Sequence, residues 1–259
     1  MGDEVLLLDR SGPVWTVTLN RPAELNSFDA ALHRAFNDVW REVEDSRDVR
    51  AVVLTGAGRA FCAGGNLDDF PVLHADFARR RRTMRDARRV VTEMLDVHVP
   101  VVAAVNGPAV GLGCTLSTLC DIVFIADDTY LADPHVAVAL VAGDGGAVTW
   151  PHHTGLLTAK RYLLTGDRIP AAEAVRLGLA TFAVPRERLL DEARAFAERL
   201  AALPHQAVQE TKALLNQQLR ASAVAALGYG LAAESQSHDT AEYLAVPDQF
   251  ARQKARRKG

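Results

Sequence analysis

The stretch RAFCAGGNL at residues 59–67 decides the fold of this chain, and it follows the apolar run AVVLTG at residues 51–56. A short apolar run of this kind predicts a buried β-strand. Two glycines, Gly64 and Gly65, come soon after it. Because glycine has no Cβ, the backbone can turn sharply there and leave amide N–H groups pointing away from the strand. Amides arranged in this way can bind an oxyanion.

A second stretch repeats this design. Residues 99–105 (VPVVAAV) predict a strand, residues 106–113 (NGPAVGLG) form the glycine-bearing turn after it, and the apolar residues 114–120 predict a buried helix. This turn therefore lies at a helix N-terminus, where free N–H groups and the helix dipole favour negative charge. Either turn alone is as typical of a simple connection between strand and helix. Together, two such turns can supply two amides to one developing oxyanion.

Taken together, the two stretches resemble the crotonase superfamily, the enoyl-CoA hydratases and isomerases. The matching motifs cover nearly the whole chain, at residues 19–22 (LNRP), 25–26 (LN), 61–67, 106–114, 163–167 (LLTGD) and 171–178. The resemblance implies an α/β fold, the crotonase-like (ClpP/crotonase) spiral of repeated ββα units with a C-terminal helical region. It also implies a spiral core with the acyl-CoA site at residues 1–203, and a region for oligomerisation and active-site cover at residues 204–259.

The composition of the chain excludes several classes of protein. Its 259 residues, 49% of them hydrophobic, can bury one large core, and a formal net charge of -3 does not favour nucleic-acid binding. The three cysteines lie in apolar surroundings with no pairing pattern, which indicates a reducing compartment. The start of the chain does not resemble a signal peptide, and no apolar run is long enough to span a bilayer. We therefore predict a cytoplasmic protein with no nucleic-acid or membrane partner.

Periodicity along the chain predicts its main elements. Two β-rich runs near the start predict a hairpin, and apolar residues at helical spacing predict a helix from Asp29, with Asp29 or Ser27 as its cap. A helix is also predicted from Gly146. The remaining predictions are a strand at residues 122–126, a short helix at 171–178, a longer one at 186–203, and C-terminal helices at 205–218, 221–238 and 247–258.

Residues 76–96 form an arginine-rich segment between the two turns, with four consecutive arginines at 79–82. Guanidinium groups bind phosphates and carboxylates by paired hydrogen bonds, so this segment could attract CoA or an acidic acyl group. A solvated helix face is the more common meaning of such a run, and we favour it. The inner face of this helix is predicted to border the acyl pocket through Met84, Val91, Met94 and Leu95.

By resemblance, the backbone N–H groups of Gly65 and Leu112 are the two oxyanion donors. The resemblance further implies an acyl-CoA thioester as substrate, assembly as a homotrimer or hexamer, and no separate cofactor, because CoA is part of the substrate. Lys254 lies in a basic tail that could reach the CoA phosphates of a neighbouring subunit, or could be a frayed end. The predicted substrate-binding residues are Leu25, Ala63, Asn66, Leu67, Asp68, Gly111 and Lys254.

The catalytic residues depart from the pattern of the superfamily. Typical hydratases carry two glutamates, and the corresponding positions here are Thr115 and His135. Threonine is a poor base, whereas histidine titrates in the useful range, and Asp144 stands where some superfamily isomerases carry a catalytic aspartate. A dry site would raise the pKa of Asp144 and make it a more capable base.

We therefore predict proton transfer with Asp144 as first-choice base, His135 as second base or orienting group, and Thr115 as the third candidate. Asp144 could instead be a structural helix cap, and His135 a packed loop histidine. His152 and His153 are adjacent and lie on a segment that is predicted to be irregular. They lack the spacing of zinc ligands, so we predict no metal.

The predicted function is that of an enoyl-CoA hydratase/isomerase type of enzyme that stabilises a thioester enolate. The missing glutamate pair argues against ordinary hydration. An acyl-CoA hydrolase, a decarboxylase or a ring-cleaving lyase would reuse the same oxyanion hole, and a non-catalytic acyl-CoA-binding homologue is the alternative from another class. The sequence does not identify the acyl group.

Overall fold

The first of the two glycine turns lies at the edge of the main sheet where its parallel strands end. The computed structural model describes residues 4–246, apart from the side chain of Leu67. Six strands are hydrogen-bonded in the order β1-β2-β3-β4-β6-β9, and only the β1–β2 pair, the predicted hairpin, is antiparallel. These strands are β1 (Leu6–Asp9), β2 (Val14–Leu19), β3 (Ala51–Gly56), β4 (Val101–Val105), β6 (Ile122–Ala126) and β9 (Phe182–Val184).

A second, smaller sheet lies beyond the ends of these strands. It consists of β5 (Ala109–Val110), β7 (Tyr130–Ala132) and β8 (Ile169–Pro170), in the order β5-β7-β8. The chain passes from β4 through the second glycine turn into β5 and then into helix α4 (Leu112–Leu119), which is one ββα unit. The pair β6 and β7 repeats the step from the large sheet to the small one. This arrangement confirms the crotonase-like α/β fold.

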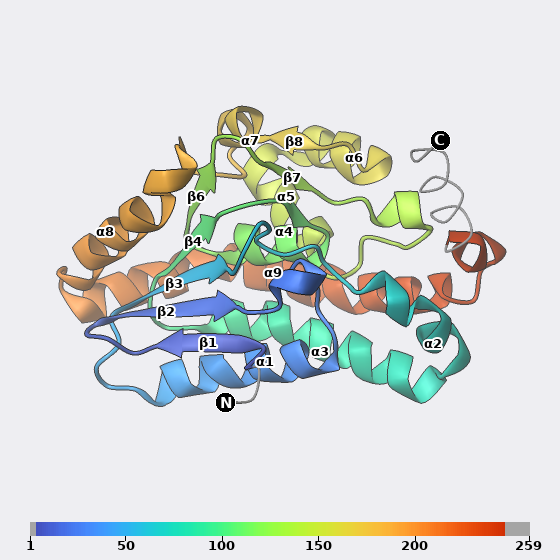
Figure 1. Ribbon diagram of the computed structural model, residues 1–259, viewed down its shortest axis with the longest axis horizontal. Helices are drawn as coiled ribbons and strands as arrows, with labels where there is room; N and C mark the ends of the chain where they lie inside the picture. Colours follow the sequence, from blue (N-terminus) through green and yellow to red (C-terminus); the bar gives the residue numbers. More distant parts are fainter. Residues whose placement is uncertain (1–3, 247–259) are drawn as a thin grey trace.

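Helices cover both faces of the main sheet (Figure 1). Because side chains alternate along a strand, every second side chain faces the helices on one side of the sheet, and the others face the helices on the opposite side. Val52 and Leu54 of β3 join the large core cluster with helices α1 (Ala30–Asp45), α3 (Phe77–Asp96) and α4, whereas Val53 joins a smaller cluster with α8 (Leu189–Ala201). Strand β3 is buried along its full length, as its unbroken apolar run predicts.

Local capping explains where the helices begin. The Asp29 carboxylate accepts hydrogen bonds from the N–H groups of Ala31 and Leu32, at 2.9 and 2.8 Å, and thereby starts α1. Asp76 caps α3 in the same way through Arg79 N. The remaining helices are α2 (Phe70–Ala75), α5 (Gly146–Thr154), α6 (Leu156–Thr165), α7 (Ala171–Leu177), α9 (His205–Ser237), and the 3-10 helices η1 (Pro22–Glu24), η2 (Leu67–Asp69), η3 (His135–Val138) and η4 (Arg186–Arg188).

Two predictions of helix boundaries are wrong. The predicted break between residues 218 and 221 does not exist, because Leu219 and Arg220 are good helix formers and continue one helix, α9, of 33 residues. The segment with His152 and His153 is not irregular but forms the end of α5, where Pro151 is accommodated inside the helix. The helix predicted at residues 247–258 lies outside the described residues.

Helix α9 is fixed against the core of the same chain. The Lys212 ammonium contacts Asp121 Oδ2 at 2.7 Å and Val99 O at 2.8 Å, and Asn216 donates to Leu95 O. Fixed by these buried contacts, the helix runs past α3 and α5 toward the ends of the β-strands, as Figure 1 shows. None of the helices between residues 4 and 246 combines the length and apolar character that a membrane span requires.

Candidate active site

The two glycine turns are held in direct contact by backbone hydrogen bonds. Cys62 N donates to Pro108 O at 3.2 Å, and Val110 N donates to Cys62 O at 2.9 Å. Gly113, in the first turn of α4, lies so close to Cys62 that an added Cβ would stand 2.2 Å from Cys62 O. Only glycine fits there, so the second turn can approach the first.

The residues of the two turns adopt backbone conformations that favour glycine. Gly64 has φ +85° and Gly111 has φ +54°, and a Cβ on Gly64 would lie 2.7 Å from Val110 O and 3.6 Å from Leu112 N. Among the described residues, the N–H groups of Gly65 and Leu112 donate no hydrogen bond. Leu112 also opens α4, where the helix dipole adds positive potential. Two free donors therefore lie at neighbouring turns.

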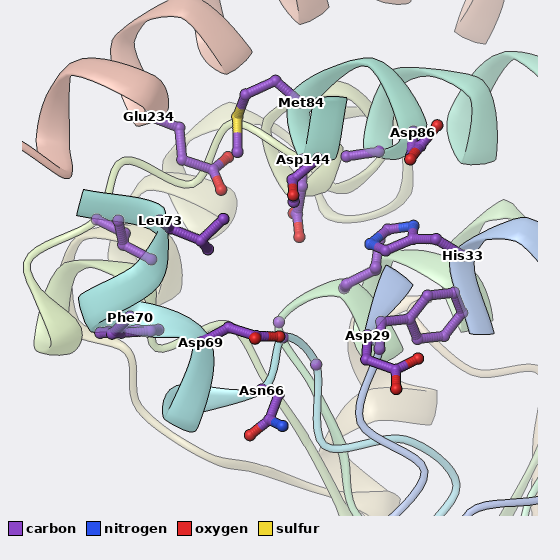
Figure 2. A pocket seen from close by; sticks show the side chains of 18 of the residues that line it. Asp29, His33, Asn66, Asp69, Phe70, Leu73, Met84, Asp86, Asp144 and Glu234 are labelled. Carbon is purple, nitrogen blue, oxygen red and sulfur yellow. The ribbon is translucent and has the colours of Figure 1, made fainter. Parts of the chain in front are cut away.

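A cavity of about 520 Å³ opens at these turns (Figure 2). Of the predicted site residues, Ala63, Gly65, Asn66, Gly111, Leu112, His135 and Asp144 line it. Leu25 is absent from the lining, and its carbonyl accepts the Ala63 N–H at 3.0 Å. Asp68 is exposed and outside the lining, so it does not join the group. Leu67 begins η2, but its side chain, like all of Lys254, lies outside the described structure.

The predicted catalytic residues form one buried chain of polar contacts. Asp133 Oδ1 is hydrogen-bonded to His135 Nδ1, and His135 Nε2 lies 3.4 Å from Asp144 Oδ2. Thr115 Oγ1 donates to Asp144 Oδ1 at 3.4 Å. Side-chain contacts thus link both positions that lack the usual glutamate to Asp144.

The charge of His135 follows from this arrangement. Burial lowers its pKa, but the carboxylates of Asp133 and Asp144 outweigh burial and hold the pKa well above its ordinary value. The ring is therefore an imidazolium at neutral pH, with a carboxylate on each nitrogen. A protonated histidine cannot accept a proton, so the geometry fits the orienting role better than that of a second base.

Strand and helix ends explain how these side chains are positioned. Asp133 and His135 directly follow β7, and Asp144 precedes α5. The N-cap of α5 is Gly145, and no side chain between residues 4 and 246 caps this helix, which argues against the alternative that Asp144 is a structural cap. Gly145 has φ +131°, and a Cβ there would stand 2.4 Å from Thr115 Cγ2. The turn is thereby pressed against α4.

Comparisons with known proteins identify the family of the chain. The family model described as Enoyl-CoA hydratase/isomerase matches residues 9–251. The chain belongs to this family. A relative named (E)-benzylidenesuccinyl-CoA hydratase, from Thauera aromatica, is 35% identical over 206 residues, which cover 79% of each chain. A Short-chain-enoyl-CoA hydratase from Clostridium acetobutylicum is 29% identical over 225 residues, 86% of this chain and 85% of the relative.

Solved structures of the enoyl-CoA hydratase/isomerase family superpose closely. A crystal structure of an enoyl-CoA hydratase/isomerase from Mycobacterium paratuberculosis has a TM-score of 0.91 and 48% identity, and covers 95% of this chain and 98% of that chain. A monofunctional enoyl CoA isomerase from M. smegmatis has a TM-score of 0.73 and 30% identity, covering 87% of this chain and 98% of the other. The relatives' names thus include both hydratases and an isomerase.

Two residues of the site were not found from the sequence. His33 of α1 and Glu234 of α9 both line the cavity and are buried. Burial lowers the pKa of His33 to about 4, so its ring is neutral. Each residue stands on an apolar helix face: Glu234 follows Leu227 and Leu231 at helical spacing. A polar residue inside a buried stripe is the signal that could have identified both.

The arginine-rich segment is mostly a surface feature. Arg79 pairs with Asp69 at 2.7 Å, and the buried Arg80 forms two hydrogen bonds of 2.9 Å with Asp239. Arg79 and Arg82 do reach the cavity lining. The predicted inner face borders the cavity through Met84 alone, because the other three predicted residues are buried in the core: Val91, Met94 and Leu95.

Three of the described residues could together hold a metal ion. One ligand atom each of Asp133, His135 and Asp144 lies within 4.8 Å of the others. Both nitrogens of His135, however, already face carboxylates, and a protonated ring accounts for this arrangement without a metal. His152 and His153 do not form a joint site, since their Nε2 atoms contact Ser222 Oγ and Thr118 O respectively. The absence of a metal stays a prediction.

Replacement of Asp133 tests the charge state of His135. In Asp133→Asn the negative charge at Nδ1 is removed, while burial, which lowers the pKa, remains. The pKa of His135 should fall toward or below its ordinary value, and the ring should then titrate in the neutral range. NMR titration of ring-labelled histidine measures this. An exposed-site control, Asp48→Asn, should leave the His135 signal unchanged, and equal titration in wild type and Asp133→Asn would contradict the proposed charge state.

Proposed function

We propose that the protein catalyses proton transfer at acyl-CoA thioesters, stabilising a thioester enolate between two backbone amides with Asp144 as the base. One observation carries this proposal: the unpaired amides of Gly65 and Leu112 and the carboxylate of Asp144 line the same cavity. The names of the relatives, which include enoyl-CoA hydratases and an isomerase, support a thioester substrate.

The residues divide the work as follows. The thioester oxygen accepts hydrogen bonds from the N–H groups of Gly65 and Leu112, which stabilises the negative charge that develops when the adjacent carbon loses a proton. Asp144 takes that proton. Its partner His135 is charged and faces Asp144 Oδ2, which orients the carboxylate, and Asp133 holds the imidazolium in place. Thr115 donates to the other Asp144 oxygen.

Among the reactions of this family, the residues of this site favour isomerisation over hydration. Hydration requires two groups to hold and activate a water molecule, and the positions usual for them are here a threonine and a charged histidine. Neither Thr115 nor His135 can act as a base at neutral pH. A positioned carboxylate beside an oxyanion site is sufficient for moving a proton, and general base catalysis of this kind contributes about 10²–10⁴-fold.

Deuterium uptake tests the role of Asp144. The protein is incubated in deuterated water with saturated and 3-enoyl acyl-CoAs, and label uptake and product mass are followed. The wild type should incorporate deuterium next to the carbonyl and shift double bonds. Asp144→Asn should lose at least 10²-fold of this activity but keep binding acyl-CoA, since its shape is retained.

The same experiment separates the alternative functions. The exposed-site variant Asp48→Asn should match the wild type. A gain of water in mass would favour a hydratase, and loss of CoA or carbon dioxide a hydrolase or decarboxylase. Binding without exchange for every substrate would favour the non-catalytic binder. Unchanged uptake in Asp144→Asn would remove Asp144 from the mechanism.

The amide of Leu112 can be tested directly because it begins a helix. Proline is tolerated at the first helical position and carries no N–H, so Leu112→Pro removes one donor. Loss of one oxyanion donor should lower the exchange rate about 10²–10³-fold. Leu112→Ala is the matched control, because it trims the side chain but keeps the amide, and it should stay within a few-fold of wild type. Similar rates for the two variants would show that the amide does not bind the oxyanion.

We also propose that the chain assembles as a homotrimer or hexamer. Several large apolar side chains on α6 and α9 are strongly exposed in the isolated chain, among them Leu157 at 85%, Val224 at 87% and Tyr229 at 80%. An exposed apolar surface of this kind marks an interface. The predicted cytoplasmic location and the reach of Lys254 to a neighbour's CoA stay predictions.

Light scattering coupled to size exclusion tests the assembly. The wild type should show three or six times the chain mass. Val224→Asp should shift the distribution toward smaller species, because a charge would be buried in the interface. A monomeric wild type at micromolar concentration would contradict the proposal.

A further inference from the structure

Glu234 is a buried acid that the proposed mechanism does not use. It lies on α9, far along the chain from the other site residues, and its side chain lines the cavity with a relative exposure of 7%. Figure 2 shows Glu234 and Asp144 on one side of the cavity and Asn66 on the other. Its Oε2 atom is buried and has no hydrogen-bond partner in the described part of the chain. A buried carboxyl oxygen without a partner is costly unless a ligand satisfies it.

Close packing of two glycines brings α9 against the loop that contains Gly143 and Asp144. A Cβ on Gly143 would stand 2.3 Å from Gly230 O and 2.8 Å from Glu234 Oε2, and a Cβ on Gly230 would stand 3.0 Å from Gly143 O. Glu234 follows Gly230 by four residues and so lies on the same helix face. Gly143 immediately precedes Asp144. The helix therefore delivers a second carboxyl group next to the proposed base.

A succession of contacts leads from the second oxyanion turn through Asp144 to Glu234. A Cβ on Gly111, in the second turn, would stand 3.3 Å from His135 Cε1. His135 contacts Asp144, and beyond Asp144 come Gly143 and Glu234. An acyl chain whose carbonyl is bound at the turns would thus pass Asp144 first and Glu234 later.

The protonation of Glu234 suits proton donation. Its pKa is raised to about 8, mainly by burial and also by Asp144 and Asp133, while His135 and the Gly143 N–H act in the opposite direction. The other titratable groups near it on the C-terminal segment are His238 and Tyr243. His238 Nδ1 contacts the backbone carbonyl oxygen of Glu234. At neutral pH the side chain is therefore a neutral acid beside the Asp144 carboxylate. Such a pair provides an acid and a base at the same pH.

We propose that Glu234 is a second catalytic residue of this site, which donates a proton to the acyl chain at a carbon beyond the one that Asp144 deprotonates. This inference rests on the proposed function and narrows its substrate class to 3-enoyl-CoA thioesters, whose double bond it would move. The glutamate pair missing at Thr115 and His135 would then be replaced by an aspartate–glutamate pair, with one member supplied by the C-terminal helix.

Protons and electrons balance in this reaction, and the site returns to its starting state. Asp144 takes a proton from C2, and the electron pair of that bond forms a dienolate whose oxygen is held by the two amides. The C1–O carbonyl then re-forms, the C1–C2 π electrons form the C2–C3 double bond, and the C3–C4 π electrons take the proton of Glu234 at C4. Asp144 is left protonated and Glu234 ionised, and transfer of the proton from Asp144 to Glu234 restores the site. No oxidant, reductant or co-substrate is required.

Two rates measured on one variant test this proposal. Deuterium exchange at C2 of butanoyl-CoA requires Asp144 alone, whereas conversion of 3-hexenoyl-CoA to 2-hexenoyl-CoA requires both acids. Glu234→Gln keeps the shape and neutrality of the protonated side chain but cannot give up a proton. It should retain exchange within about threefold and lose double-bond migration about 10²–10⁴-fold. Glu210→Gln, an exposed carboxyl on the same helix, should change neither rate.

Each outcome separates this inference from the proposed function. If the wild type exchanges C2 protons but Glu234→Gln still moves the double bond at the wild-type rate, the inference is wrong and the proposed function stands. Loss of both rates in a folded variant that still binds butanoyl-CoA also contradicts it. Absence of exchange in the wild type contradicts the proposed function itself.

The wild type alone gives an answer if Glu234→Gln does not fold. Migration should decline as pH rises through about 8, because Glu234 then loses its proton, while C2 exchange should not decline over that range. Parallel pH profiles for the two rates would overturn the proposal.

Discussion

The close backbone contact between the two glycine turns is the constraint on which the rest of the site depends. Cys62 exchanges hydrogen bonds with Pro108 and Val110, and this pairing links the end of the β3 unit to the start of β5. A side chain at Gly113 would force the pair apart, since its Cβ would meet Cys62 O. Within residues 4–246, the fold therefore holds two amides without a hydrogen-bond partner on turns that are bonded to each other, and donors fixed in advance can stabilise an oxyanion without reorganisation.

Charge is the second constraint, and it is balanced within the cavity. Asp133, Asp144 and Glu234 are all buried, and three carboxylates together would be strongly unfavourable. The imidazolium of His135 lies between two of them, and the third holds its proton through a raised pKa. The site thus combines the charged ring of His135 with the neutral acid of Glu234. The same balance that makes burial tolerable also sets which residue can accept a proton and which can donate one.

The sequence predicted those parts of the site that depend on local chemistry. Glycines after apolar strands predicted both turns, and Asp29 before an apolar helix face predicted the start of α1, because turns and caps are determined by neighbouring residues. The charge state of His135 was not predictable, since it depends on Asp133 and Asp144 across two loops. The apolar helix face around Glu234 is a local signal of burial, but its place next to the Asp144 loop follows from the approach of Gly230 to Gly143, which no local pattern indicates.

The structure of the protein with bound butanoyl-CoA would test the account most directly. A saturated thioester has no double bond to move, so it can occupy the site as a stable ligand. The account predicts the thioester oxygen within hydrogen-bond distance of both Gly65 N and Leu112 N, with C2 beside Asp144 and the end of the acyl chain directed toward Glu234. A carbonyl bound away from the two amides, or an acyl chain leading away from Asp144, would contradict it.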